Sequence, residues 1–229
     1  MQRKTFTHSL LALAACALIT PLAAHAQTVK LTLGHGAAVG NPRHEASVKF
    51  AEVAKAQSGG RIEVSIAPSA QLGDDAAMVT ALRTGALDIS ANSQGAVSSA
   101  VPEYAAFGMP FLFSTPADAF KLLDGPLGKE LADKSLAKGM VLLGYWDNGI
   151  RHMTNGKRPI SKVEDMKGLK MRTPPDAVLV DIMQSLGADA QQIKFAELYV
   201  ALQQGELDLL RVRAQRLHDV HQHRVGWCA

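Results

Sequence analysis

The chain has 229 residues, of which 47% are apolar and 20% are charged, so it is long enough for one or two packed domains and is not globally disordered. Aromatic residues make up only 5% of the chain, which argues against a surface built to stack nucleic-acid bases. Beyond residue 26 the chain holds 22 basic and 21 acidic residues. This near-neutral body gives no electrostatic case for binding nucleic acid or an anionic membrane.

The first 26 residues contain the three parts of an export signal in order. Arg3 and Lys4 precede an apolar run over residues 10–19, which is too short for a membrane span, and residues 24–26 form an A-x-A cleavage site. We therefore expect residues 1–26 to be a signal peptide that is cleaved before Gln27, and the mature protein to be periplasmic. Residues 13–16 (LAAC) also resemble a lipoprotein box, which is the alternative.

Strand and helix patterns then alternate along the chain. Alternation with a period of two predicts strands over residues 29–33, 61–66 and 87–90, and cap signals predict intervening helices over residues 41–57 and 74–84. This β-α-β-α-β order is the unit of a parallel sheet with right-handed crossovers. Further along, the pattern predicts helices over residues 116–123 and 127–138 and an apolar strand over residues 140–145.

A second α/β unit begins near Trp146. Its predicted strands cover residues 151–154 and 169–172, and its predicted helices cover residues 176–186 and 195–204. The fold class is therefore α/β.

Candidate chemistry is sparse, since the chain has no phosphate-binding loop, no dinucleotide fingerprint and no hydrolase or zinc-protease motif. Arg172 follows a predicted strand and precedes a predicted helix, and Arg151 opens another strand. Ligands of open α/β sheets collect at the carboxyl ends of strands, where a guanidinium can hold a carboxylate through two hydrogen bonds. From spacing alone, a solvated or structural arginine is the better interpretation of Arg172, because such arginines are common.

The remaining candidates are weaker. His218, His221 and His223 have spacing that could ligate a metal, but a polar tail explains them better and we predict no metal site. Glu197, Glu206 and Asp208 fit ordinary helix-surface acids better than general acids or bases. The mature chain would hold one cysteine, Cys228, so an intramolecular disulfide is excluded.

Five segments in order resemble one known family. They are residues 68–75 (PSAQLGDD), 109–113 (MPFLF), 148–151 (NGIR), 165–172 (DMKGLKMR) and 195–205 (FAELYVALQQG). The chain thereby resembles the TRAP-type solute-binding proteins, the DctP-like periplasmic receptors of tripartite ATP-independent transporters. The resemblance covers residues 29–208.

The resemblance implies a periplasmic binding protein of type II, in which two α/β lobes close on an organic acid. It implies that Arg172 clamps the ligand carboxylate, that Arg151 is a second contact and that Phe195 packs against the ligand. Asn148 shares the motif of Arg151. Further cleft-facing candidates, expected in loops, are Ser93, Gln94, His35, Gly36 and His44.

The implied function is a receptor, not an enzyme. It would bind a C4-dicarboxylate or a sugar acid such as a uronate without a cofactor, act as a monomer, and deliver the ligand to the TRAP membrane permease subunits. A secreted α/β enzyme and a truncated, non-functional fragment of such a receptor are the alternatives.

The resemblance stops after Asp208. Residues 209–213 read LLRVR where the family has GQENP, and residues 209–229 are rich in arginine and histidine. We therefore expect a signal peptide over residues 1–26, a first lobe over residues 27–146, a partial second lobe over residues 147–208, and an aberrant basic tail over residues 209–229. A frame-shift or an artificial end would explain such a tail.

Overall fold

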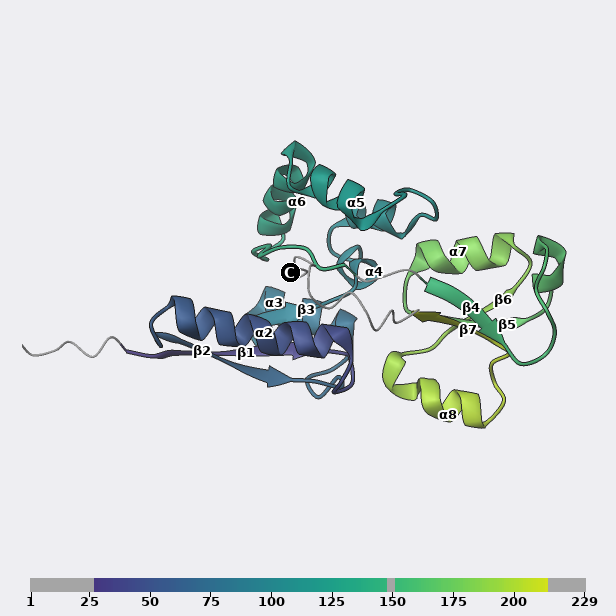
Figure 1. Cartoon of the computed structure of the whole chain (residues 1–229), viewed down its shortest axis with the longest axis horizontal. Helices are drawn as coiled ribbons and strands as arrows, with labels where there is room; N and C mark the ends of the chain where they lie inside the picture. Colours follow the sequence, from purple (N-terminus) through teal and green to yellow (C-terminus); the bar gives the residue numbers. More distant parts are fainter. Residues whose placement is uncertain (1–26, 148–150, 214–229) are drawn as a thin grey trace, which may run out of the picture.

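The computed structural model describes residues 27–147 and 151–213, which form two separate β-sheets with their helices (Figure 1). We call the part over residues 27–147 lobe 1 and the part over residues 151–213 lobe 2. Within these ranges every helix is too short or too polar to be a bilayer span.

The sheet of lobe 1 has the strand order β2-β1-β3 and is parallel throughout. Strand β1 (Val29–His35) lies between β2 (Ile62–Ala67) and β3 (Ile89–Ala91). The predicted β-α-β-α-β unit is therefore confirmed. Because all three strands run the same way, their carboxyl ends share one edge of the sheet, and the loops that follow them meet there.

The two crossover helices begin where polar side chains accept hydrogen bonds from their first turns. Asn41 caps α2 (Pro42–Gln57) by accepting from the Arg43 amide, and Asp74 caps α3 (Asp75–Thr84) by accepting from the Ala77 amide. Gly85, with φ of 74°, ends α3 in the left-handed conformation that favours glycine.

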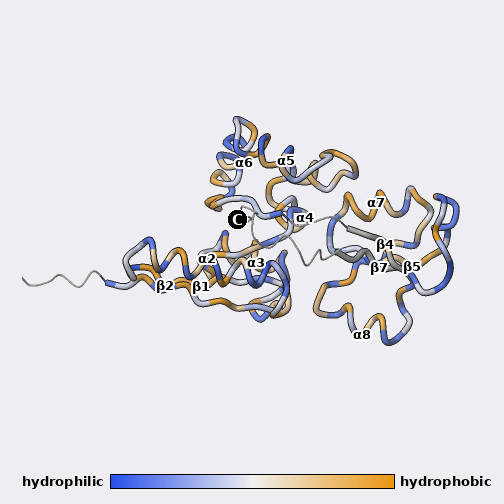
Figure 2. Tube along the Cα trace, viewed as in Figure 1, coloured by the Kyte–Doolittle hydropathy of each residue, from blue (hydrophilic) through white to orange (hydrophobic). Residues whose placement is uncertain are grey.

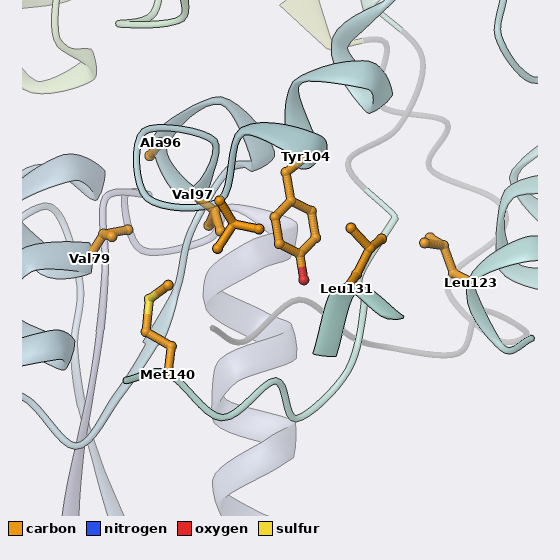
Figure 3. Packing of buried hydrophobic residues seen from close by; sticks show 8 residues of the cluster. Val79, Ala96, Val97, Tyr104, Leu123, Leu131 and Met140 are labelled. Atoms are coloured by element: carbon orange, nitrogen blue, oxygen red, sulfur yellow. The ribbon is translucent and has the colours of Figure 1, made fainter. Parts of the chain in front are cut away.

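A helical layer completes lobe 1. It consists of α4 (Gln94–Val97), η1 (Pro102–Gly108), α5 (Pro116–Leu123) and α6 (Pro126–Ala137). These elements enclose a core in which the fully buried Tyr104 ring lies between Val97 and Leu131 (Figure 3). The Tyr104 hydroxyl lies 3.1 Å from the Ser135 hydroxyl oxygen, so the polar end of this ring is satisfied inside the core.

The strand predicted over residues 140–145 is wrong. This segment belongs to neither sheet, and only Gly144 takes part in an isolated bridge. Val141 and Leu143 are exposed while Met140 is buried. The period-two pattern thus predicts the extended backbone and one buried face, but a strand also needs a partner, which local sequence does not supply.

The sheet of lobe 2 is mixed, with the order β4-β7-β5-β6. Its strands are β4 (Arg151–Asn155), β5 (Lys170–Thr173), β6 (Asp189–Gln192) and β7 (Leu209–Arg213). Strand β5 is parallel to both β6 and β7, and β4 is antiparallel to β7. A 3-10 turn, η2 (Val163–Met166), precedes β5.

Two helices lie on opposite sides of this sheet (Figure 1). Helix α7 (Ala177–Ser185), hydrophobic over most of its length (Figure 2), buries Met183 in a cluster with Met171 of β5. Helix α8 (Leu198–Gln203) follows the 3-10 turn η3 (Phe195–Glu197). The predicted helices and strands of this unit are present, and β6 is an additional strand that the sequence did not predict.

The structure differs from the expected division at residue 209. Residues 209–213, expected to begin an aberrant tail, form β7 in an inner position of the lobe 2 sheet. Apolar and basic residues alternate over residues 210–213 (LRVR), which suits a strand and which the comparison with the family motif obscured. Residues 1–26 and 214–229, including the histidines of the predicted tail, lie outside the described residues.

The core around Tyr104 generates a stability prediction. Leu131 of α6 is 2% exposed, whereas Leu136 of the same helix is 60% exposed. Leu131→Ala should lower the free energy of unfolding by about 2–5 kcal/mol, because it leaves a cavity. Leu136→Ala is the control and should change it by less than about 0.5 kcal/mol. Urea denaturation of both variants measures the difference, and equal effects would contradict the position of α6.

Candidate functional site

Arg172 lies near the carboxyl end of β5 and is 8% exposed. Its Nε donates a hydrogen bond to the main-chain oxygen of Ile193 at 2.9 Å. Burial lowers the pKa of Arg172 from its usual value, and the negative charge of Asp75 opposes that shift. Among the described residues, Nη1 and Nη2 have no hydrogen-bond acceptor, so this edge of the guanidinium can hold a carboxylate through two parallel bonds.

Asp75, whose charge acts on Arg172, belongs to lobe 1 and is held from two directions. Nη1 of Arg43 lies 3.2 Å from each of its carboxylate oxygens, and the Ser93 amide donates to Oδ2 at 3.0 Å. The same Arg43 nitrogen also donates to the Ala91 carbonyl at the end of β3, at 3.3 Å. Both Asp75 oxygens are therefore already engaged within lobe 1, and neither is a hydrogen-bond acceptor for Arg172.

In the part of the chain that the structure describes, two polar contacts join the lobes directly. The Gln94 amide of lobe 1 donates to Oδ2 of Asp176 in lobe 2 at 3.1 Å, and Nζ of Lys194 in lobe 2 lies 2.8 Å from Oδ2 of Asp74 in lobe 1. The lobes approach so closely at Gly95 that an added Cβ would collide with the Asp176 side chain. A residue other than glycine at position 95 would therefore push the lobes apart.

These contacts bear on Ser93 and Gln94, which the sequence predicts as ligand contacts. The Gln94 amide is engaged by Asp176, and the main chain of Ser93 is engaged by Asp75. Ser93 occupies the N-cap position of α4, but its side chain makes no capping hydrogen bond. Both residues lie at the junction of the lobes, and contact with a ligand remains a prediction for each.

The structure describes the other predicted ligand contacts, Asn148, Arg151 and Phe195, only in part. Asn148 lies outside the described residues. The backbone of Arg151 opens β4 opposite Arg213, at the edge of the sheet where β5 and β7 end. From the register, Arg151 lies two strands across and three residues along from Arg172, which is a backbone separation of about 14 Å. Phe195 directly follows the Lys194 contact and is half exposed.

His35 and His44, expected in loops, instead belong to β1 and α2. His35 is fully buried, and burial together with the positive charge of Arg43 lowers its pKa to about 4. Its Nδ1 accepts from the Ala37 amide at 3.2 Å, so Nε2 carries the proton and donates to Nδ1 of His44 at 3.3 Å. A neutral His35 therefore lies beside the Arg43–Asp75 pair.

Sequence reasoning missed several members of this junction: Arg43, Asp75, Asp176 and Lys194. Asp75 ends the family-like segment 68–75, and both Asp75 and Asp176 are acids at helix starts. That position is the available signal, since helices that follow strand ends begin at the shared edge. Their partners are far away in the sequence, which no local pattern reports. No group of three or more metal-ligating side chains occurs within the described ranges.

The arrangement of two α/β lobes with an arginine at a strand end agrees with a comparison against known families. The family model of the bacterial extracellular solute-binding proteins, family 7 (DctP), matches residues 33–209. The chain belongs to this family. The predicted resemblance is therefore confirmed, and so is the fold class, a two-lobed α/β protein of the type II periplasmic binding fold.

This chain is also similar to individual members of the family. Protein y4mM of Sinorhizobium fredii is 48% identical over 227 residues, which cover 97% of this chain and 42% of the relative. The sugar-acid-binding protein DctPAm of Advenella mimigardefordensis, solved with galactonate, is 36% identical with a TM-score of 0.77, covering 81% of this chain and 60% of that chain.

A TRAP periplasmic solute-binding protein of Sulfurospirillum deleyianum, solved with succinate, is 34% identical with a TM-score of 0.75, again covering 81% of this chain and 60% of that chain. The chain thus spans less than two thirds of the length of each of these relatives.

The buried His35 generates a pH prediction. Its pKa is lower in the folded state than in the unfolded state, so the unfolded chain binds the proton first as the pH falls. The free energy of unfolding should therefore decrease between pH 6.5 and about pH 4, by about 3 kcal/mol in total from this residue. His35→Asn, which keeps an acceptor for the Ala37 amide, should remove this part of the pH dependence.

Chemical denaturation at several pH values measures the effect. His44→Asn is the control and should retain the pH dependence, because burial of His35 is its largest cause. Parallel pH profiles for the wild type and His35→Asn would disprove the assignment.

Proposed function

We propose that this protein is a receptor that binds a small organic acid in the periplasm and delivers it to the membrane permease of a TRAP transporter. The observation that carries this proposal is Arg172, buried at a strand end with the Nη edge of its guanidinium unpaired among the described residues. This unpaired edge offers two charge-assisted donors, which favours an anionic ligand. Family 7 is a class of solute-binding proteins, which favours a receptor over an enzyme.

The ligand chemistry follows from the carboxylate that an arginine fork recognises. Galactonate and succinate, the ligands of the two solved relatives, each present a carboxylate. We therefore propose a sugar acid or a C4-dicarboxylate as the ligand class. Arg151, whose backbone lies on the same sheet edge, is proposed as a second contact, together with Asn148, and Phe195 is proposed to pack against the ligand.

The receptor would act as a monomer and without a cofactor. Closure of the two lobes over the ligand would exclude water and strengthen the Arg172–carboxylate interaction. In this proposal Arg172 of lobe 2 recognises the ligand carboxylate. Asp75 and Ser93 of lobe 1 lie on the opposite side of the ligand.

Replacing Arg172 tests the carboxylate clamp. Arg172→Ala should weaken binding of galactonate or succinate by about 2–5 kcal/mol, because both parallel hydrogen bonds and their charge are lost. That is about 30-fold to several thousand-fold in Kd. Arg172→Lys should recover only part of the affinity, since an ammonium group cannot reproduce the planar fork. Isothermal titration calorimetry measures all three proteins.

Arg61→Ala is the matched control. Nε of Arg61 also donates a hydrogen bond to a main-chain oxygen, that of Ser58, at 2.9 Å, but Arg61 is exposed and lies just before β2 in lobe 1. Its replacement should leave Kd unchanged. An Arg172→Ala variant that melts like the wild type and binds the acids equally well would refute the proposed function.

Export generates a second test. Protein recovered from a Gram-negative periplasm should begin at Gln27, because the A-x-A site ends at Ala26. Intact-mass spectrometry decides the point. A mass that retains Met1, or one that shows a lipidated Cys16, would contradict periplasmic release by this cleavage.

A further inference from the structure

The two contacts that join the lobes are made by aspartates in equivalent roles. Asp74 caps α3 of lobe 1 with Oδ1, which accepts from the Ala77 amide at 2.8 Å, and reaches lobe 2 with Oδ2. Asp176 caps α7 of lobe 2 with Oδ1, which accepts from the Leu179 amide at 3.3 Å, and reaches lobe 1 with Oδ2. In each aspartate, one oxygen fixes the carboxylate on its own helix and the other crosses to the opposite lobe.

We propose that Asp74 and Asp176 are reciprocal ties that hold the lobes together, and that Lys194 is a positioning residue that sets ligand affinity through the tie to Asp74. This inference rests on the proposed function. The cap bond matters because it removes the rotational freedom of each carboxylate before the lobes meet. A pre-oriented acceptor loses less conformational entropy when the opposite lobe arrives.

Lys194 is connected to Arg172 through one residue. The Ile193 amide donates to the Thr173 carbonyl at 3.1 Å, and the Ile193 carbonyl accepts from Nε of Arg172 at 2.9 Å. The segment that carries Lys194 is therefore bonded to the end of β5 at two points, the Thr173 carbonyl and the Arg172 side chain. When Lys194 moves toward lobe 1, the Arg172 guanidinium therefore moves toward lobe 1 with it.

Asp74, the lobe 1 partner of Lys194, is also close to the residues that surround Arg172. Asp74 precedes Asp75, which holds Arg43 and the Ser93 amide and whose charge acts on Arg172. The Lys194–Asp74 bond thus joins the segment that is bonded to Arg172 in lobe 2 to the segment that contains Asp75 in lobe 1. The hydrogen bond and charge of Lys194 lower the pKa of Asp74, so the carboxylate stays ionised at neutral pH.

The tie acts on affinity through the population of closed molecules. Apparent affinity falls in proportion to the fraction of molecules in the binding-competent state. The Lys194 and Asp74 side chains are 53% and 26% exposed, so the bond is partly screened by solvent. An ion pair of this kind shifts an equilibrium by a modest factor, about two- to fivefold, that weakens as salt is added.

The test replaces Lys194 by methionine, which keeps most of the length of the side chain and removes its charge. Without ligand, small-angle X-ray scattering should show a larger radius of gyration for Lys194→Met than for the wild type. The Kd for galactonate or succinate should rise about two- to fivefold at low salt. The difference between the two proteins should shrink at 0.5 M NaCl, because salt screens the pair in the wild type.

Three further variants separate a tie from a general effect. Lys55→Met is the matched control, since Lys55 and Glu63 also pair at 2.8 Å but within lobe 1, and it should leave both the radius of gyration and Kd unchanged. Lys194→Arg should restore the wild-type values, because it keeps the charge. Asp74→Asn retains the cap on α3 and should reproduce the effect of Lys194→Met without adding to it in the double variant.

The outcomes distinguish this inference from the proposed function. If the wild type binds neither acid, the proposed function fails, and scattering without ligand still decides whether the Lys194–Asp74 tie exists. If Lys194→Met and Lys55→Met have the same radius of gyration and the same Kd as the wild type, the tie does not hold the lobes and the inference is wrong. An effect of Lys194→Met that persists unchanged at high salt would also overturn it.

Discussion

The hydrogen bond from Nε of Arg172 to the Ile193 carbonyl determines how the rest of the guanidinium can be used. The bond fixes one edge of the planar group against the backbone of lobe 2. The remaining edge, with Nη1 and Nη2, has the spacing of a carboxylate. Since β5 and β6 pair in parallel, the Ile193 carbonyl lies just past the end of β6 and within reach of Arg172 only when these strands are in register. The binding chemistry therefore depends on the strand register.

Within residues 27–147 and 151–213, no acid forms an ion pair with Arg172 by direct contact. Asp75 is close enough to act on Arg172 electrostatically, but its oxygens are occupied by Arg43 and the Ser93 amide. Asp176, four residues beyond Arg172, is likewise committed to its helix cap and to Gln94. An acid that bonded Arg172 directly would compete with a ligand carboxylate, and this arrangement keeps both acids occupied elsewhere.

The sequence predicts most of the fold because its signals are local. Alternation over residues 29–33 and 61–66, and caps at Asn41 and Asp74, set the first sheet and its helices without reference to distant residues. Strand β6 escaped prediction because its sequence, DAQQ, has no apolar face, and its pairing with β5 supplies what composition does not. The opposite error occurred over residues 140–145, where a strand-like pattern has no partner in either sheet.

The site was predictable in part for the same reason. A strand followed by an arginine and a helix identifies Arg172 as a ligand candidate, whereas the contacts of Gln94 with Asp176 and of Lys194 with Asp74 join residues 82 and 120 positions apart. Long-range polar pairs of this kind carry no local periodicity. The helix-capping aspartates are the only trace that they leave in the sequence.

The inner position of β7 has a consequence for the order in which the protein is assembled. Strand β7 separates β4 from β5, although it comes after both in the chain. Until residue 213 has been synthesised, β4 has no neighbour in this sheet and β5 has one open edge. Unpaired edges of this kind recruit other chains, so the interval between synthesis of β5 and arrival of β7 is the period in which lobe 2 is most exposed to aggregation. The central strand of lobe 1 passes through the same kind of interval, because one edge of β1 stays open until β3 ends at residue 91.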